Sequence, residues 1–185
     1  MKIIVIFGAA IVIAAVLLYN RLVRARNRVD TAWSDIDVQL QRRHDLIPNL
    51  VKAVDQYAKY ERATLAAVTE LRAEAKTITD VEELGRIEEE LSSGLQRLIA
   101  VAEDYPDLKA NENFLKLQAE LVETENYLQF ARRYYNGSVR DYNTMTETVP
   151  SNVVASLFGF DVRKFFQKSS DEVAAVPLVK LGSVE

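Results

Sequence analysis

The chain has 185 residues, of which 49% are hydrophobic and 27% are charged, and its formal net charge is −4. This length suits one folded domain with short additions, and the composition is too apolar for a wholly disordered chain. The chain contains no cysteine and a single histidine, which excludes disulfides, thiol catalysis and metal sites built from several histidines of one chain.

The N-terminal segment is an uninterrupted apolar run from Ile3 to Leu18. As a helix it would measure about 24 Å at 1.5 Å per residue, slightly less than the roughly 30 Å hydrocarbon core of a bilayer. Lys2 and Tyr19 suit the two interfaces, so we predict a transmembrane anchor over residues 1–20. A cleaved signal peptide is the alternative, but no small-residue cleavage site follows the run.

Four arginines follow the anchor closely, whereas the other side carries only Lys2. The positive-inside rule therefore predicts a single-pass protein of the cell (inner) membrane, with the N-terminus outside and the rest of the chain in the cytoplasm. The same arginines are candidate contacts for anionic lipid headgroups, unless they serve only to set this topology. They are Arg21, Arg24, Arg26 and Arg28.

From Arg21 to Lys76 apolar residues recur at spacings that alternate between three and four. Most a and d positions of the resulting heptads are apolar, which predicts a long amphipathic helix of coiled-coil character. Pro48 lacks a backbone donor and should free a carbonyl of the preceding turn. Because the apolar register continues across Pro48, we predict one kinked helix rather than two separate helices.

Two further long helices show the same kind of apolar stripe. One is expected to begin after a cap at Thr79 or Asp80, and to end before residues 103–107. The other runs from about Asn111 to Val149. Each stripe must be buried against the others, which antiparallel neighbours with short loops achieve most simply.

A short fourth helix, capped by Ser151 or Asn152, should end at Gly159. The predicted fold is therefore all-α: an N-terminal transmembrane helix followed by an up-and-down antiparallel helical bundle of three long helices plus a short fourth. The bundle domain spans residues 21–160, and residues 161–185 form a tail that we expect to be partly disordered.

Charge and aromatic residues are distributed unevenly along the chain. The first bundle helix is net positive and residues 77–149 are strongly negative, so a nucleic-acid partner is not expected. A cluster of aromatics after the third helix either closes the open end of the bundle or dips into the membrane interface or a partner. The cluster consists of Phe158, Phe160, Phe165 and Phe166.

Three sequence segments stand out as a set: residues 19–51, residues 131–143 and residues 150–160. The first includes Ala-Trp-Ser-Asp-Ile-Asp-Val-Gln-Leu and Arg-Arg-His-Asp-Leu-Ile-Pro-Asn-Leu-Val, and the second includes Ala-Arg-Arg-Tyr-Tyr-Asn. Together with the anchor they closely resemble the bacterial LemA family over residues 1–167. The resemblance implies a single-pass membrane protein with a helical bundle and without an established catalytic activity. It also implies a link to a membrane metalloprotease, and in magnetic bacteria to membrane remodelling.

The segment Arg42-Arg43-His44-Asp45 raises the question of an active site, in which His44 would be a general base oriented by Asp45 or Asp37. A carboxylate-bridged metal pair in a bundle would need two Glu-x-x-His motifs, and the single histidine excludes that design. The structural interpretation is a buried polar layer near the proline kink, whose donors satisfy freed carbonyls. A partner-binding surface is the other interpretation of these residues.

The candidate residues for this polar layer or partner surface are Asp35, Asp37, Arg42, Arg43, His44, Asp45, Arg132 and Arg133. We predict no catalytic, cofactor-binding or metal-binding residue. The predicted function is a non-enzymatic, membrane-anchored scaffold or adaptor, whose partner is a membrane protease, another membrane protein or a second copy of the chain. The alternative is a lipid-binding or membrane-remodelling oligomer, and a hydrolase or metalloenzyme comes third.

Overall fold

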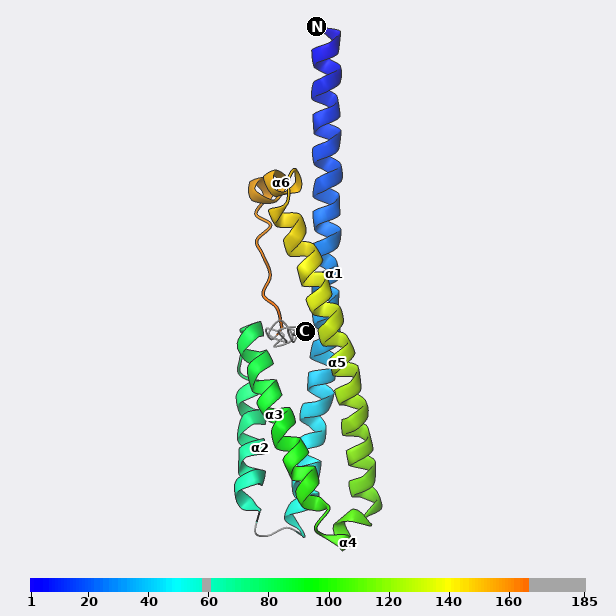
Figure 1. Cartoon of the computed structure of the whole chain (residues 1–185), viewed down its shortest axis with the longest axis vertical. Coiled ribbons are helices and arrows are strands. Elements are labelled where there is room, and N and C mark those ends of the chain that lie inside the picture. The colour runs from blue at the N-terminus through cyan, green and yellow to red at the C-terminus, as the bar shows by residue number, and fades with distance from the viewer. Residues whose placement is uncertain (58–60, 167–185) are drawn as a thin grey trace, which may run out of the picture.

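The structure, a computed structural model, describes residues 1–57 and 61–166 and contains no strand within those ranges. The all-α prediction is confirmed, and consecutive long helices run in opposite directions, as Figure 1 shows. The helices are α1 (Lys2–Asp55), α2 (Arg62–Ala75), α3 (Val81–Ala102), α4 (Pro106–Lys109), α5 (Glu112–Glu147) and α6 (Ser151–Phe158).

Helix α1 continues through Pro48 without a break, as the uninterrupted apolar register predicted. It ends at Asp55, however, and α2 begins at Arg62, so the single helix expected as far as Lys76 is divided into two. The reversal lets α2 bury Leu65 and Val68 against α3. A straight continuation would have carried these side chains past the end of the bundle, so tertiary packing overrides the continuous helical register.

Helices α1 and α5 pack against each other along most of the bundle, and the other elements cover them in two halves (Figure 1). The α2–α3 hairpin covers the half away from the N-terminus, and α6 lies at the other end, beside α1. The core accordingly falls into two apolar clusters. The proximal cluster includes Leu22, Val29, Ile36, Leu128, Tyr142 and Phe166, and the distal cluster includes Ile47, Leu50, Leu91, Leu98 and Phe114.

The helix ends follow local sequence signals in most places. Asp80 caps α3 by accepting hydrogen bonds from two backbone N–H groups, and Asn111 caps α5 in the same way. Helix α6 differs from expectation at its start, because Pro150 occupies the cap position and Ser151 is the first helical residue. Gly159 ends α6 with φ of +68°, a left-handed conformation that glycine adopts without a steric penalty.

Residues 161–166 have no regular secondary structure and run from α6 back along the bundle toward α3 (Figure 1). We call this segment the strap. The predicted partly disordered tail thus begins with an ordered portion, and residues 167–185 lie outside the described part of the chain.

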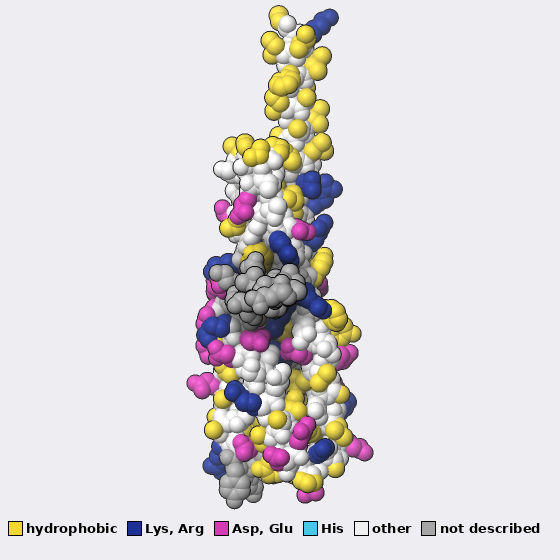
Figure 2. All heavy atoms as spheres, viewed as in Figure 1, with side chains coloured by type: hydrophobic (Ala, Val, Ile, Leu, Met, Phe, Trp, Pro, Cys, Tyr) yellow, Lys and Arg dark blue, Asp and Glu magenta, His cyan; other side chains and the backbone are white. Residues whose placement is uncertain are grey.

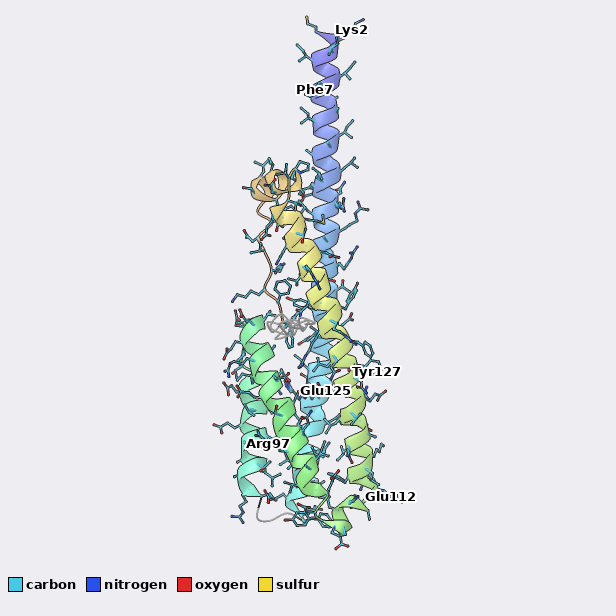
Figure 3. The ribbon with its side chains drawn as sticks, viewed as in Figure 1. Lys2, Phe7, Arg97, Glu112, Glu125 and Tyr127 are labelled. Atoms are coloured by element: carbon cyan, nitrogen blue, oxygen red, sulfur yellow. The ribbon has the colours of Figure 1, made fainter. Side chains whose placement is uncertain are left out.

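The N-terminal part of α1, before Leu18, projects beyond the bundle as a free rod, and Figure 2 shows that hydrophobic side chains cover it. In Figure 3, Lys2 and Phe7 lie on this rod, far from the other helices. Among the described residues, α1 is the one helix that is long and apolar enough to cross a membrane.

Candidate functional site: a buried polar layer

A layer of charged and polar side chains separates the proximal cluster from the distal cluster. Arg43 and His44 come from α1, Glu88 and Ser92 from α3, and Glu125 from α5. On each helix these residues fall at the point where one apolar cluster ends and the other begins. The layer therefore crosses the whole bundle at a single level.

The carboxylate of Glu88, which is fully buried, is the centre of the layer. Its Oε1 lies 2.7 Å from His44 Nε2, and its Oε2 accepts a hydrogen bond of 3.2 Å from Arg43 Nη1. An ionised carboxylate only accepts hydrogen bonds, so it suits the nitrogen donors that α1 places beside it. Both oxygens of Glu88 are thus satisfied by α1, which ties α3 to α1.

Arg43 is 2% exposed and its guanidinium has three partners. Besides Glu88, it donates a hydrogen bond of 2.7 Å to Ser92 Oγ, and Nη1 lies 3.4 Å from Glu125 Oε2. Figure 3 shows Glu125 on the side of α5 that faces the bundle interior. The hydroxyl of Ser92 in turn donates to the backbone carbonyl of Glu88. A buried cation with this many partners joins α1, α3 and α5 at one point.

The remaining candidates from the sequence are not in the layer. Asp35, Asp37, Arg42, Asp45 and Arg133 are exposed. Arg132, the other remaining candidate, has a largely enclosed guanidinium. This group lies 3.7 Å from the Glu89 carboxylate and stacks over the Phe166 ring.

The side-chain contacts of the exposed candidates lie on the surface of the bundle. Arg42 pairs with Glu123 at 3.0 Å, Asp45 accepts a hydrogen bond from Gln41, and Arg133 lies over the ring of Phe130. Burial lowers the pKa of the Arg132 guanidinium, whereas the nearby Glu125 carboxylate acts in the opposite direction. The sequence candidates therefore divide into a buried pair, Arg43 and His44, the largely enclosed Arg132, and five residues exposed on the bundle surface.

Sequence reasoning missed the residues that complete the layer. Glu88 carried a usable signal, because it lies four residues after Leu84 and one after Ile87, within the apolar stripe of α3. A carboxylate in a buried stripe requires a buried cation or donor opposite it. Ser92 and Glu125 carried no comparable signal, since small polar and acidic residues are common on helix surfaces.

The chemical capacity of the layer is limited by its enclosure. His44 and Glu88 have the geometry of a base with its orienting carboxylate, but the His44 side chain is only 6% exposed. Among residues 1–57 and 61–166, no group of three histidines and carboxylates is placed to hold a metal ion. A pocket of about 150 Å³ between α3 and α5 reaches Arg43 and Glu125, and most of its wall is apolar. The arrangement is suited to fixing helix positions.

At the N-terminal end of the bundle, the four arginines split into two groups. Arg21, Arg24 and Arg28 are exposed and line a hollow between α1 and α5, which Asp141 also borders. Arg26 points elsewhere and stacks over the ring of Phe160. The exposed three are the ones positioned to meet an anionic surface.

The cluster of C-terminal phenylalanines also splits into two groups. Phe160 and Phe166 are buried in the proximal cluster, where Phe166 lies 5.9 Å from the Trp33 ring, whereas Phe158 and Phe165 are partly exposed. Two of the four phenylalanines therefore close the bundle, and the other two contribute to its surface.

A set of exposed apolar side chains lies along the outer groove between α1 and α5. Val38 from α1 and Tyr127, Phe130 and Tyr134 from α5 are each more than half exposed, and they line a shared hollow. In Figure 3, Tyr127 points away from the bundle. We call these four residues the aromatic face. Large apolar side chains gathered in this way on a surface are typical of contact sites.

Comparison with known proteins gives consistent matches. The model of the LemA family matches residues 32–181. A magnetosome protein, MamQ 2 of Paramagnetospirillum magneticum, is 25% identical over 91% of this chain and 71% of its own length. Protein LemA of Metamycoplasma hominis is 28% identical over 83% of this chain and 70% of its own length. The family match covers the polar layer, the aromatic face and α6.

Proposed function

The chain belongs to the LemA family, and from this premise and the aromatic face we propose that it is a membrane-anchored scaffold that acts through protein–protein contacts without catalysis. The free apolar rod of α1 would cross the cell membrane once. The exposed arginines that follow it favour a cytoplasmic bundle by the positive-inside rule. The rigid continuation of α1 would hold the aromatic face away from the bilayer.

The aromatic face is the observation that carries the proposal. Aromatic residues are enriched at the centres of protein interfaces, where they bury a large area at a small cost in conformational entropy. The groove runs between the antiparallel helices α1 and α5. A third helix could pack into it with its apolar stripe against the aromatic face. We therefore propose an amphipathic helix of a membrane-protein partner as the occupant.

A photo-crosslinking amino acid at position 130 of the full chain, introduced in living cells, tests the scaffold proposal. We expect a discrete adduct when the crosslinker replaces Phe130. We expect none when it replaces Arg140, an exposed residue of the same helix. The adduct should disappear in a Tyr127→Ser, Tyr134→Ser background that leaves the melting temperature unchanged. An adduct that persists in this background, or no adduct at position 130, contradicts the proposal, and an adduct of twice the chain mass would identify a second copy instead.

The predicted orientation has a direct test because the chain contains no cysteine. A single Glu103→Cys variant, in the acidic half of the bundle, should react with a membrane-impermeant maleimide only after the cells are lysed. Labelling of intact cells would place the bundle on the outer side.

Membrane remodelling is the second candidate function, and the exposed Arg21, Arg24 and Arg28 favour it. Each basic residue near an anionic surface contributes about 1 kcal/mol of attraction. On this proposal, reconstitution into anionic vesicles should produce oligomers and deform the vesicles, and an Arg21→Gln, Arg24→Gln, Arg28→Gln variant should do neither. Unchanged vesicles with the wild-type chain would exclude this candidate.

A further inference from the structure

Helix α6 presents an apolar face that the described residues leave uncovered. Val153 and Leu157 are 66% and 77% exposed, and Val149, just before the helix, is 81% exposed. Val153 and Leu157 are spaced by four and share one side of the helix, whereas Val154 and Ala155 are buried in the proximal cluster. We propose that the exposed face of α6 lies in the bilayer interface beside the anchor.

The position of α6 relative to α1 supports this placement. The ring of Phe158 meets the ring of Tyr19 edge-on, with centroids 4.9 Å apart, and Leu18 packs against the proximal cluster. A bilayer core of about 30 Å corresponds to about 20 helical residues, so a span that begins at Met1 leaves the hydrocarbon near Asn20. Helix α6 therefore stands at the level where α1 enters the headgroup region, provided that α1 spans the membrane as proposed above.

The composition of this region suits a membrane interface better than water. Residues 148–160 contain no charged side chain, and Figure 2 shows hydrophobic side chains along the upper edge of the α6 region, on the side from which the free rod of α1 projects. An interfacial helix typically buries its apolar face about 5–10 Å into the boundary between headgroups and acyl chains.

The neighbouring basic residues complete the interfacial pattern. Arg21 lies two residues after Tyr19 on α1, and Arg24 and Arg28 follow on the same exposed side. Each helical residue advances about 1.5 Å, so these guanidinium groups begin within a turn of the level of α6, where phosphate headgroups would lie. Apolar side chains at the acyl boundary and cations just beyond it match the profile of an anionic bilayer. We therefore infer that a lipid surface covers the exposed face of α6.

The absence of cysteine allows a depth measurement on the full chain. Three single-cysteine variants, each labelled with an environment-sensitive fluorophore, are reconstituted into phosphatidylcholine–phosphatidylglycerol vesicles. They are Leu157→Cys on α6, Ile11→Cys within the proposed span, and Leu115→Cys at the far end of α5, all at exposed positions. At Leu157 we expect a severalfold lower quenching by aqueous iodide than at Leu115, together with quenching by lipids that carry a shallow nitroxide.

The outcomes separate this inference from the proposed span. Iodide quenching at Leu157 as strong as at Leu115, with Ile11 still protected, overturns the docking of α6 and leaves the span intact. Exposure of Ile11 as well overturns both. Protection of Leu157 that disappears when the protein is diluted in lipid shows that a second copy covers α6, and it also overturns the inference.

Discussion

Arg72 on α2 donates a hydrogen bond of 2.6 Å from Nε to the backbone carbonyl of His44 on α1. In an α-helix this carbonyl would accept from the N–H of the residue four positions later, which here is Pro48 and has no N–H. A side chain from a neighbouring helix thus replaces the missing backbone donor. The contact explains how α1 stays helical through a proline at the level of the polar layer.

The first prediction follows from this replacement. Arg72→Met keeps most of the aliphatic chain but leaves the His44 carbonyl without its donor, so it should lower the free energy of unfolding by about 1–3 kcal/mol. In a Pro48→Ala background the new N–H can bond to that carbonyl, and the cost of losing Arg72 should shrink. Denaturant unfolding of the four full-length proteins in detergent, followed by circular dichroism, measures this coupling. Additive costs would show that Arg72 stabilises the bundle by some other contact.

The second prediction compares two adjacent arginines of opposite burial. Arg43→Met removes the cation that balances Glu88, and breaking a buried pair in this way typically costs about 3–5 kcal/mol. Arg42→Met breaks only the half-exposed pair with Glu123, which is worth about 0–1 kcal/mol. The difference in unfolding free energy between these two variants therefore isolates the effect of burial.

A third substitution extends the same comparison. Glu88→Met combined with Arg43→Met removes both charges, so the double variant should lose less stability than the two single variants together. Equal stability of the Arg43→Met and Arg42→Met variants would contradict a structural role for the layer.

His44→Ala should also lower the melting temperature, by more than a degree, since it removes a hydrogen bond to Glu88 and a buried ring.

The fold class could be read from the sequence because it depends on periodicity, which is local. The stripes of α3 and α5 and the caps at Asp80 and Asn111 are visible in windows of a few turns. The reversal after Asp55 is not visible in this way, because its cause is the burial of α2 against α3. The short helix α4 was missed for a similar reason, since its four residues are too few for a stripe.

The polar layer shows the same division between local and tertiary information. Pro48 indicated that a carbonyl needs a donor, and Arg43 and His44, shortly before the proline, were the donors that the sequence favoured. The donor is instead Arg72, 28 residues away, and only the packing of α2 on α1 brings it there. The carboxylate shared by Arg43 and His44 belongs to Glu88 of α3, a helix that supplied none of the residues named for the layer from the sequence, and Glu125 of α5 lies beside Arg43.

The third prediction concerns Asp80, which has two roles. It caps α3 through hydrogen bonds from the N–H groups of Glu82 and Glu83, and it pairs with Lys164 of the strap. Asp80→Asn retains an acceptor for the cap and loses the pair, whereas Asp80→Ala loses both. Thermal unfolding should therefore rank wild type above the Asn variant and the Asn variant above the Ala variant. Equal stability of the two variants would show that the cap contributes nothing.

The same residue predicts a pH dependence. The hydrogen bond from Lys164, followed by that from the Glu83 N–H, lowers the pKa of Asp80 below its ordinary value of 3.8. A carboxyl with a lowered pKa in the folded state stabilises the fold above its ordinary pKa, and the contribution disappears as the pH falls through the folded value. The stability advantage of wild type over Asp80→Asn should thus be constant near pH 7 and shrink below about pH 4. An advantage that grows on acidification would contradict this assignment.

The strap is fastened to α5 by two asparagines that each bind backbone in both directions. Asn136 donates to the carbonyl of Phe166 at 3.1 Å and accepts from its N–H at 2.9 Å. Asn143 makes the equivalent pair with Arg163, at 2.9 and 2.8 Å. Between these points the Tyr135 hydroxyl donates to the carbonyl of Lys164. Seven residues separate the asparagines, or about two helical turns, so both amides face the strap.

The last prediction uses the single tryptophan as a reporter of the strap. Asn136→Leu removes both hydrogen bonds to Phe166, which should cost about 1–3 kcal/mol at 0.5–1.5 kcal/mol per bond. It should also release the buried Phe166 ring from Trp33, so the fluorescence emission of Trp33 should shift to longer wavelength in the folded protein. Asn126→Leu, at an exposed position of the same helix, is the matched control and should leave the emission unchanged. An unshifted emission in the Asn136 variant would mean that the aromatic contacts of Phe166 hold the strap without the amide, since this ring also lies under the Arg132 guanidinium.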